Sequence, residues 1–259
     1  MAQAANEARW RQTRPVTLEH WLAAAGDLLL GAKCHGCGQL WWGICPSCRQ
    51  QLARRRPFFT TPVPCPDGFP VTVTSSAYDP ILRKVINAHK EHQALTLTSF
   101  LAERLAWSVH TLLMSEPHGA GGIVLVPIPS SAHAVRRRGF DATASIARLA
   151  ARQLRARYPM TVRLALAQGR RVADQAGLGA AARQQNLCGA FRLRKPITAA
   201  AAVLVDDLVT TGSSLTEAAR VLRAARITVL GAATVAATVR LRPPKSAQIG
   251  DFEGQVFTD

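Results

Sequence analysis

Two adjacent carboxylates and a group of hydroxyls stand together near the C-terminal end of the chain. Asp206 and Asp207 follow AAVLV, an apolar run with the composition of a buried strand. Adjacent carboxylates suit two neighbouring sugar hydroxyls, and a glycine turn that opens a helix offers N–H groups and a favourable dipole to a phosphate. The turn residues that follow the aspartates are Thr210, Thr211, Gly212, Ser213 and Ser214. The stretch therefore indicates a ribose 5-phosphate site. An acidic turn before a Ser/Thr helix cap is the alternative, but it explains only one or two of these residues.

Four cysteines form two closely spaced pairs nearer the N-terminus. Each pair presents two thiolates, and two pairs complete the tetrahedral shell of Zn²⁺. The expected ligands are Cys34, Cys37, Cys45 and Cys48. Because all four positions are cysteines, no position is left for a water molecule, and the zinc is expected to be structural. A redox dithiol is the alternative, although that chemistry needs only one pair.

The chain is strongly basic. Its 32 lysines and arginines against 16 acidic residues give a formal net charge of +16, which attracts phosphates, nucleic acid or acidic membranes. GC-rich codon usage, which favours Ala and Arg, would produce the same excess without any partner. The longest uncharged apolar run, 227–239, is too short to span a bilayer, and the polar N-terminus does not fit a secretory signal. We therefore expect a cytoplasmic protein without a membrane span.

Helical and strand patterns alternate along the part of the chain that must position these residues. An amphipathic helix is expected at 17–30, and a basic, Pro-rich linker at 54–70 contains the expected domain boundary near residue 66. Further on, the expected strands are 71–78, 123–129, 162–167, 202–207 and 227–237, and the expected helices are 80–88, 94–114, 140–156, 178–186 and 214–225. Continuously apolar strands separated by helices predict a parallel sheet covered on both faces. The predicted division is residues 1–66 for helix, ribbon and linker, 67–239 for the α/β domain and 240–259 for a tail.

Several ordered motifs resemble one known family. The stretch VLVDDLVTTGSS resembles the phosphoribosyl-pyrophosphate (PRPP) motif of type I phosphoribosyltransferases, and a cysteine ribbon ahead of it resembles the ComF family, which is associated with competence for DNA uptake. The similarity includes AYDPILRKVINAHK, VLVPIPSSAHAVRRRGFD and DQAGLGAAARQQNLCGAFRL and covers about residues 20–239. The resemblance implies a type I phosphoribosyltransferase fold with a small N-terminal zinc ribbon.

The resemblance also assigns roles to residues. Asp206 and Asp207 would bind the ribose hydroxyls and orient PRPP for catalysis, 210–214 would hold its 5-phosphate, and the DQAGL loop at 174–178 would close over the substrate. The predicted pyrophosphate contacts are Pro127, Ile128, Pro129, Ser130, Arg136, Arg138 and Lys90, with Arg137 beside them. Alone, three adjacent arginines are more typical of a solvated face. The chain departs from the family pattern, which often has His-Arg and Asn-Gln, at Ser131, His133, Asp141 and Ala142.

The reaction that the resemblance implies is displacement of pyrophosphate from C1 of PRPP by an acceptor, with Mg²⁺ accompanying PRPP. No residue pattern identifies the acceptor. Three functions follow: a phosphoribosyltransferase, an accessory protein that senses PRPP or nucleotides during DNA uptake, and a zinc-ribbon adaptor that binds DNA or a protein. Single-stranded or duplex DNA and a helicase-type competence protein are the expected macromolecular partners.

Overall fold

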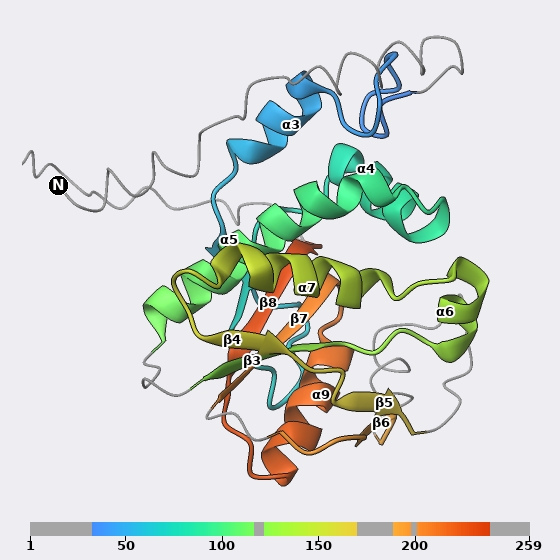
Figure 1. Ribbon diagram of the computed structural model, residues 1–259. Helices are drawn as coiled ribbons and strands as arrows, with labels where there is room; N and C mark the ends of the chain where they lie inside the picture. Colours follow the sequence, from blue (N-terminus) through green and yellow to red (C-terminus); the bar gives the residue numbers. More distant parts are fainter. Residues whose placement is uncertain (1–32, 117–121, 170–188, 198–200, 239–259) are drawn as a thin grey trace, which may run out of the picture.

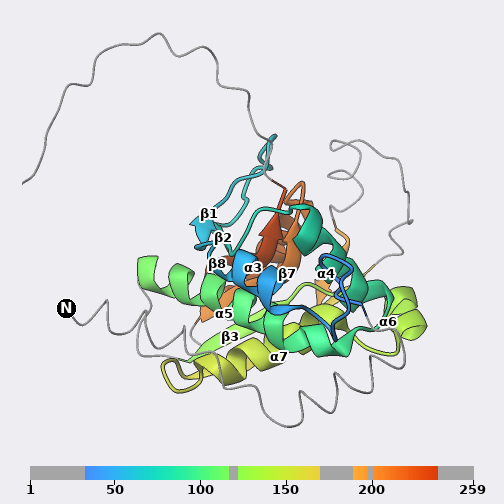
Figure 2. The same ribbon diagram turned by 90° about the horizontal axis from the view of Figure 1, so that it is seen from above.

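A computed structural model describes residues 33–116, 122–169, 189–197 and 201–238. The expected helices at 17–30 and 178–186, the loop at 174–178 and the tail at 240–259 lie outside these ranges. The described part contains a sheet with the strand order β1-β2-β8-β7-β3-β4 (Figures 1 and 2). Its strands are β1 Phe58–Phe59, β2 Thr72–Thr74, β3 Ile123–Pro127, β4 Met160–Val162, β7 Ala201–Val209 and β8 Val229–Ala237. Only the β1–β2 pair of this sheet is antiparallel. The predicted α/β class with a mostly parallel sheet is confirmed.

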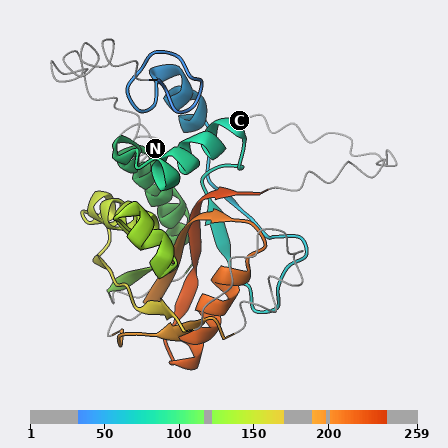
Figure 3. The same cartoon turned by 90° about the vertical axis from the view of Figure 1, so that its right-hand side faces the viewer.

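Helices cover both faces of the sheet. In Figure 3, α5 and α7 lie on one side of the sheet and α9 on the other. Alternate residues of β7 serve the two apolar cores: Val203 and Val205 face α5 and α7, whereas Ala202 and Leu204 face α9. The helices are α3 Pro46–Ala53, α4 Pro80–Glu91, α5 Thr98–Ser115, α6 Ala132–Arg138, α7 Ala142–Leu154 and α9 Ser213–Ala224, with a 3₁₀ turn, η1, at Leu95–Leu97. In the described ranges, no helix is both long enough and apolar enough to cross a membrane.

Two predicted elements divide in the structure. The expected strand 162–167 is wrong as a single strand, because β4 pairs with β3 in the main sheet while β5, Leu166–Gln168, pairs with β6, Phe191–Leu193, in a separate hairpin. The expected helix 140–156 begins at Ala142, and α6 precedes it. Gly139 ends α6 in the left-handed conformation, with φ of 73°, and the Asp141 carboxylate accepts the Ala144 N–H to start α7.

The four cysteines and α3 lie within residues 33–53, which we call the cysteine module. Several polar contacts hold this module and the residues just after it against the sheet domain. Arg49 pairs with Glu103 of α5 at 2.5 Å, and Arg55 forms an ion pair with Asp79, the N-cap of α4. The buried Arg104 guanidinium donates to the Arg55 carbonyl at 2.8 Å. Apolar contact accompanies these bonds, because α3 contributes its fully buried leucine to the larger core. The module therefore rests on the first turn of α4 and on α5, above the sheet as seen in Figure 1.

Candidate functional site

The four cysteines lie together, as the sequence predicted. Their Sγ atoms all lie within 4.8 Å of one another. An isolated antiparallel bridge joins Lys33 to Leu40 around the first pair, and the second pair begins α3, where Cys45 is the N-cap. Three of the cysteines are buried and Cys37 is exposed. The cluster has the ligand type and the closeness that tetrahedral Zn²⁺ requires.

Backbone N–H groups point at the cysteine sulfurs. Gly36 and Cys45 each donate to Cys34 Sγ at 3.3 Å, and Cys48 donates to Cys45 Sγ at 3.4 Å. Burial raises the pKa of Cys34, but the backbone hydrogen bonds have the larger and opposite effect. The net pKa is lowered to about 6. Burial raises the pKa of Cys45 and Cys48. Four neighbouring thiolates repel one another, so a bound divalent cation would stabilise the ionised cluster. The residues fit a structural metal such as zinc.

The two aspartates lie within β7 and not after it. The prediction that the strand ends at Asp207 is wrong, because Val209 still pairs with Ala237 of β8. Asp207 is buried and Asp206 is half-buried. The paired backbone therefore fixes both carboxylates close to the carboxyl edge of the sheet, where parallel α/β sheets bind ligands.

Lys90, near the end of α4, is the counter-ion of this acidic pair. Its Nζ lies 2.5 Å from Asp207 Oδ2. Burial raises the pKa of the Asp207 carboxyl, but the opposite effect of the Lys90 charge is larger. The net pKa therefore lies below the ordinary value. The pKa of Asp206 is raised well above its ordinary value by burial and by the Asp207 charge. On acidification Asp206 therefore takes up a proton first, and Asp207 is the carboxylate that stays ionised.

The predicted phosphate turn joins β7 to α9. Gly212 is the N-cap of α9 and has φ of 76°, a left-handed conformation that favours glycine. The Thr211 and Ser213 hydroxyls lie 3.0 Å apart. A Cβ on Gly212 would lie 2.6 Å from the Phe69 ring and 2.9 Å from Pro62. The linker before β2 therefore packs against the turn, and N–H groups of the first helical turn have no partner within the helix.

The predicted pyrophosphate loop follows the neighbouring strand, β3. Because Pro127 pairs in register with Val205, the loop that starts at Ile128 leaves the sheet beside the aspartates. Its backbone remains tied to β7, since the Ile128 N–H donates to the Val205 carbonyl at 2.9 Å. Ser130 donates to Asp141 at 3.3 Å. The structure therefore brings 127–130 next to the acidic pair.

Two of the departures from the family pattern have structural roles in this loop. The Ser131 hydroxyl accepts the Ala134 N–H at 3.1 Å and caps α6, and Asp141 caps α7. Serine and aspartate are both good N-cap residues. Of the other two departures, His133 is exposed and Ala142 is buried.

The three arginines of α6 differ in their surroundings. Arg136 is exposed, whereas Arg137 and Arg138 both form ion pairs with Glu91, the last residue of α4. The Arg138 side chain is only 13% exposed. Figure 2 shows that α4 ends beside α6, so the sequence neighbours Lys90 and Glu91 reach the acidic pair and the arginines, respectively.

Sequence reasoning missed Glu91, Phe69 and His89. His89 is buried, its Nε2 lies 3.0 Å from Thr98 Oγ1, and burial lowers its pKa to about 4. It is therefore a neutral packing residue next to Lys90 in the sequence. Phe69 had no sequence signal beyond its place in the linker. Glu91 could have been noticed as the acidic neighbour of a candidate lysine, but its arginine partners are 46 and 47 residues away in the sequence.

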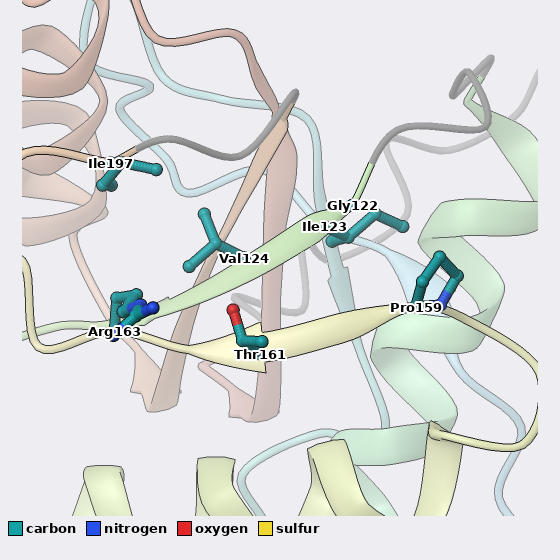
Figure 4. A pocket seen from close by; sticks show the side chains of 7 residues that line it. All are labelled: Gly122, Ile123, Val124, Pro159, Thr161, Arg163 and Ile197. Carbon is teal, nitrogen blue, oxygen red and sulfur yellow. The ribbon is translucent and has the colours of Figure 1, made fainter.

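A pocket elsewhere in the molecule is lined by none of the residues of the candidate site. It lies at the amino end of β3 and β4, where Ile123, Thr161 and Ile197 are among its lining residues, and Arg163 supplies its charge (Figure 4). The aspartates and the phosphate turn are at the opposite edge of the sheet. This pocket therefore does not contribute to the candidate site.

Comparisons with known proteins agree with the fold. A model of the phosphoribosyl transferase domain matches residues 136–254. The DNA utilization protein YhgH of Escherichia coli strain K12 is 30% identical over 196 residues, which cover 70% of this chain and 84% of that protein. The protein of the same name from Salmonella typhimurium is 30% identical over 198 residues, with the same coverage. The chain thus has a phosphoribosyltransferase fold with a cysteine cluster ahead of it. It belongs to the ComF family.

Proposed function

We propose that the protein binds Mg²⁺-PRPP at the carboxyl edge of its sheet and transfers the phosphoribosyl group to an acceptor, with release of pyrophosphate. The observation that carries the proposal is the convergence of three features on this edge. These are the acidic pair of β7, the glycine turn that starts α9 and the loop that leads from β3 to the arginines of α6. Each matches one part of PRPP: the ribose diol, the 5-phosphate and the pyrophosphate.

In this proposal the catalysis is electrostatic and positional. Asp206 and Asp207 accept hydrogen bonds from the ribose hydroxyls and fix the ring, while residues 210–214 hold the 5-phosphate through backbone N–H and hydroxyl groups. The loop at 127–130 and the arginines of α6 stabilise the negative charge that develops on the leaving pyrophosphate. Mg²⁺ would neutralise part of that charge, and the two carboxylates supply oxygen atoms of the type it prefers.

Calorimetric titration with Mg²⁺-PRPP tests binding, and pyrophosphate release with purine, pyrimidine and amine acceptors tests transfer. Asp206→Asn combined with Asp207→Asn should lower the affinity by roughly two orders of magnitude or more, since charge-assisted hydrogen bonds contribute about 1.5–3 kcal/mol each. Glu116→Gln, just beyond the far end of α5, is a control for the loss of a carboxylate away from the site. Binding without release would favour a PRPP sensor, and a wild type that does not bind PRPP would refute the proposal.

A second candidate function is contact with DNA. Two observations favour it: the net charge of +16 and the similarity to proteins named for DNA utilization. On the cysteine module, Leu40, Trp41 and Trp42 expose 61%, 40% and 52% of their surface. Exposed aromatic rings beside basic groups are typical of surfaces on which single-stranded nucleic acid stacks. We propose that this module and the linker after it supply the DNA contact.

The salt dependence of single-stranded DNA binding tests this second function. Arg54 and Arg56 are exposed, and Arg55 between them is half-buried and forms an ion pair with Asp79. Arg54→Gln with Arg56→Gln should weaken binding and reduce the slope of log K against log salt by about 0.7 for each phosphate that the variant no longer neutralises. A double variant of two exposed α7 arginines, Arg148→Gln with Arg152→Gln, serves as the control. An affinity that does not change with salt would refute the proposal.

A further inference from the structure

The last two residues of α4 carry opposite charges and pair with different parts of the candidate PRPP site. Lys90 pairs with the acidic pair of β7, and Glu91 pairs with the arginines of α6. Lys90 Nζ lies 2.5 Å from Asp207 Oδ2. The next residue, Glu91, pairs through Oε1 with Arg138 Nη2 at 2.5 Å and through Oε2 with Arg137. The ribose-binding carboxylate and the pyrophosphate-binding arginines therefore both have protein partners before any ligand arrives.

We propose that Glu91 is a built-in competitor of the pyrophosphate group. Its carboxylate occupies Arg137 and Arg138, and a bound polyphosphate must displace it from them. The proposal concerns regulation of the site proposed above and rests on that function for its link to PRPP. The anion-binding step does not depend on that function, because inorganic pyrophosphate alone can test it.

The exposure of the groups favours displacement over permanent attachment. The Glu91 side chain is 37% exposed and belongs to the last residue of α4, so it can rotate into solvent without breaking the helix. Asp207, by contrast, is held inside the sheet with only 3% of its side chain exposed. Two adjacent residues at the end of α4 thus form ion pairs of different kinds. The Lys90–Asp207 pair is firmly held, and the pairs of Glu91 with the arginines can be released.

The Arg138 guanidinium retains an unused donor. Its Nε is buried and has no hydrogen-bond partner among the described residues, although Nη2 is paired with Glu91. Glu91 has only two oxygen atoms and divides them between two arginines. A pyrophosphate group has more acceptor oxygens and more charge, so it could satisfy both guanidinium groups, including Nε.

The test compares anion affinity in Glu91→Gln with that of the wild type. Removal of a competing, partly exposed ion pair should raise the affinity for inorganic pyrophosphate by roughly two- to fivefold. Asp141→Asn is the matched control, because it removes the same charge, pairs with neither arginine and keeps a good N-cap residue whose Oδ1 can still accept the Ser130 and Ala144 hydrogen bonds. Calorimetric titration with magnesium-free pyrophosphate, with thermal melts of each variant, provides the measurement.

The two possible roles of Glu91 predict opposite results. A competitor gives a larger gain of affinity in Glu91→Gln than in Asp141→Asn. A carboxylate that only positions the arginines gives an unchanged or weaker affinity in Glu91→Gln, which would overturn the proposal. Mg²⁺-PRPP is titrated in parallel. If the wild type binds pyrophosphate but not PRPP, the proposed function fails while the role of Glu91 is still decided. If PRPP binds and Glu91→Gln changes nothing, the competitor fails and the function stands.

Discussion

Single replacements of the two aspartates should affect protein stability differently, and only the replacement of Asp207 should destabilise the protein. Asp207 is buried and paired with Lys90, so Asp207→Asn leaves an ammonium group without its partner. Loss of one partner from a buried polar pair costs about 1–3 kcal/mol, which in a domain of this size lowers Tm by about 2–12 °C. The pKa of Asp206 is raised, so the ionised form is disfavoured. Asp206→Asn should therefore leave the free energy of unfolding unchanged or increase it slightly.

The pH dependence provides an independent check of the same reasoning. The folded-state pKa of Asp207 is lowered, so its contribution is present above the ordinary carboxyl pKa and is lost as pH falls through the folded value. The deficit of Asp207→Asn should therefore shrink on acidification below about pH 4. Because the Asp206 pKa is raised, the wild type loses stability as pH rises from about 4 towards the folded value. The relative gain of Asp206→Asn should grow over that range.

Urea unfolding of the wild type and the two single variants at about pH 3, 4 and 7 measures both effects. Equal slopes of free energy against urea would show that the denatured states remain comparable. If Asp207→Asn is as stable as Asp206→Asn at pH 7, the assignment of the Lys90 pair as a stabilising contact is refuted.

Two further predictions concern the cysteine cluster and the glycine turn. Freshly purified protein should carry one equivalent of zinc by atomic absorption, and Cys45→Ser should lose it and increase proteolysis after residue 33; less than half an equivalent in the wild type would contradict this. Gly212→Ala should destabilise the protein by about 1 kcal/mol or more, because alanine disfavours the positive φ and its Cβ collides with the Phe69 ring. Its thermal melt and PRPP titration should both show losses, and a fully stable variant with normal binding would contradict the close packing.

The sequence was sufficient where the information is local. Two C-x-x-C pairs predicted the cysteine cluster, and apolar runs separated by helical patterns predicted the parallel sheet. The strand end was placed too early because charged residues normally mark solvent, and no local pattern reveals that Asp207 lies in a paired strand beside Lys90. The division of the expected strand 162–167 was also hidden, because the two halves differ only in the distant strands that they pair with.

The contacts within the candidate site depend on long-range geometry. Glu91 meets the arginines of α6 only because α4 and α6 end beside one another, and Phe69 meets Gly212 only because the linker passes the start of α9. Neither contact leaves a periodic or motif-like trace in one sequence. The assignments of Asp206, Asp207 and the turn at 210–214 to PRPP remain predictions that the titrations above would test.

The Arg104 guanidinium has a practical consequence for the design of recombinant fragments. It is buried and donates to the Arg55 carbonyl at 2.8 Å and to the Ser75 carbonyl at 2.6 Å. A fragment that starts at residue 67 would delete the first of these acceptors, together with Leu52 from the larger core and the edge strand β1. Expression trials of the sheet domain without the four cysteines should therefore retain the chain from about Leu52 onwards.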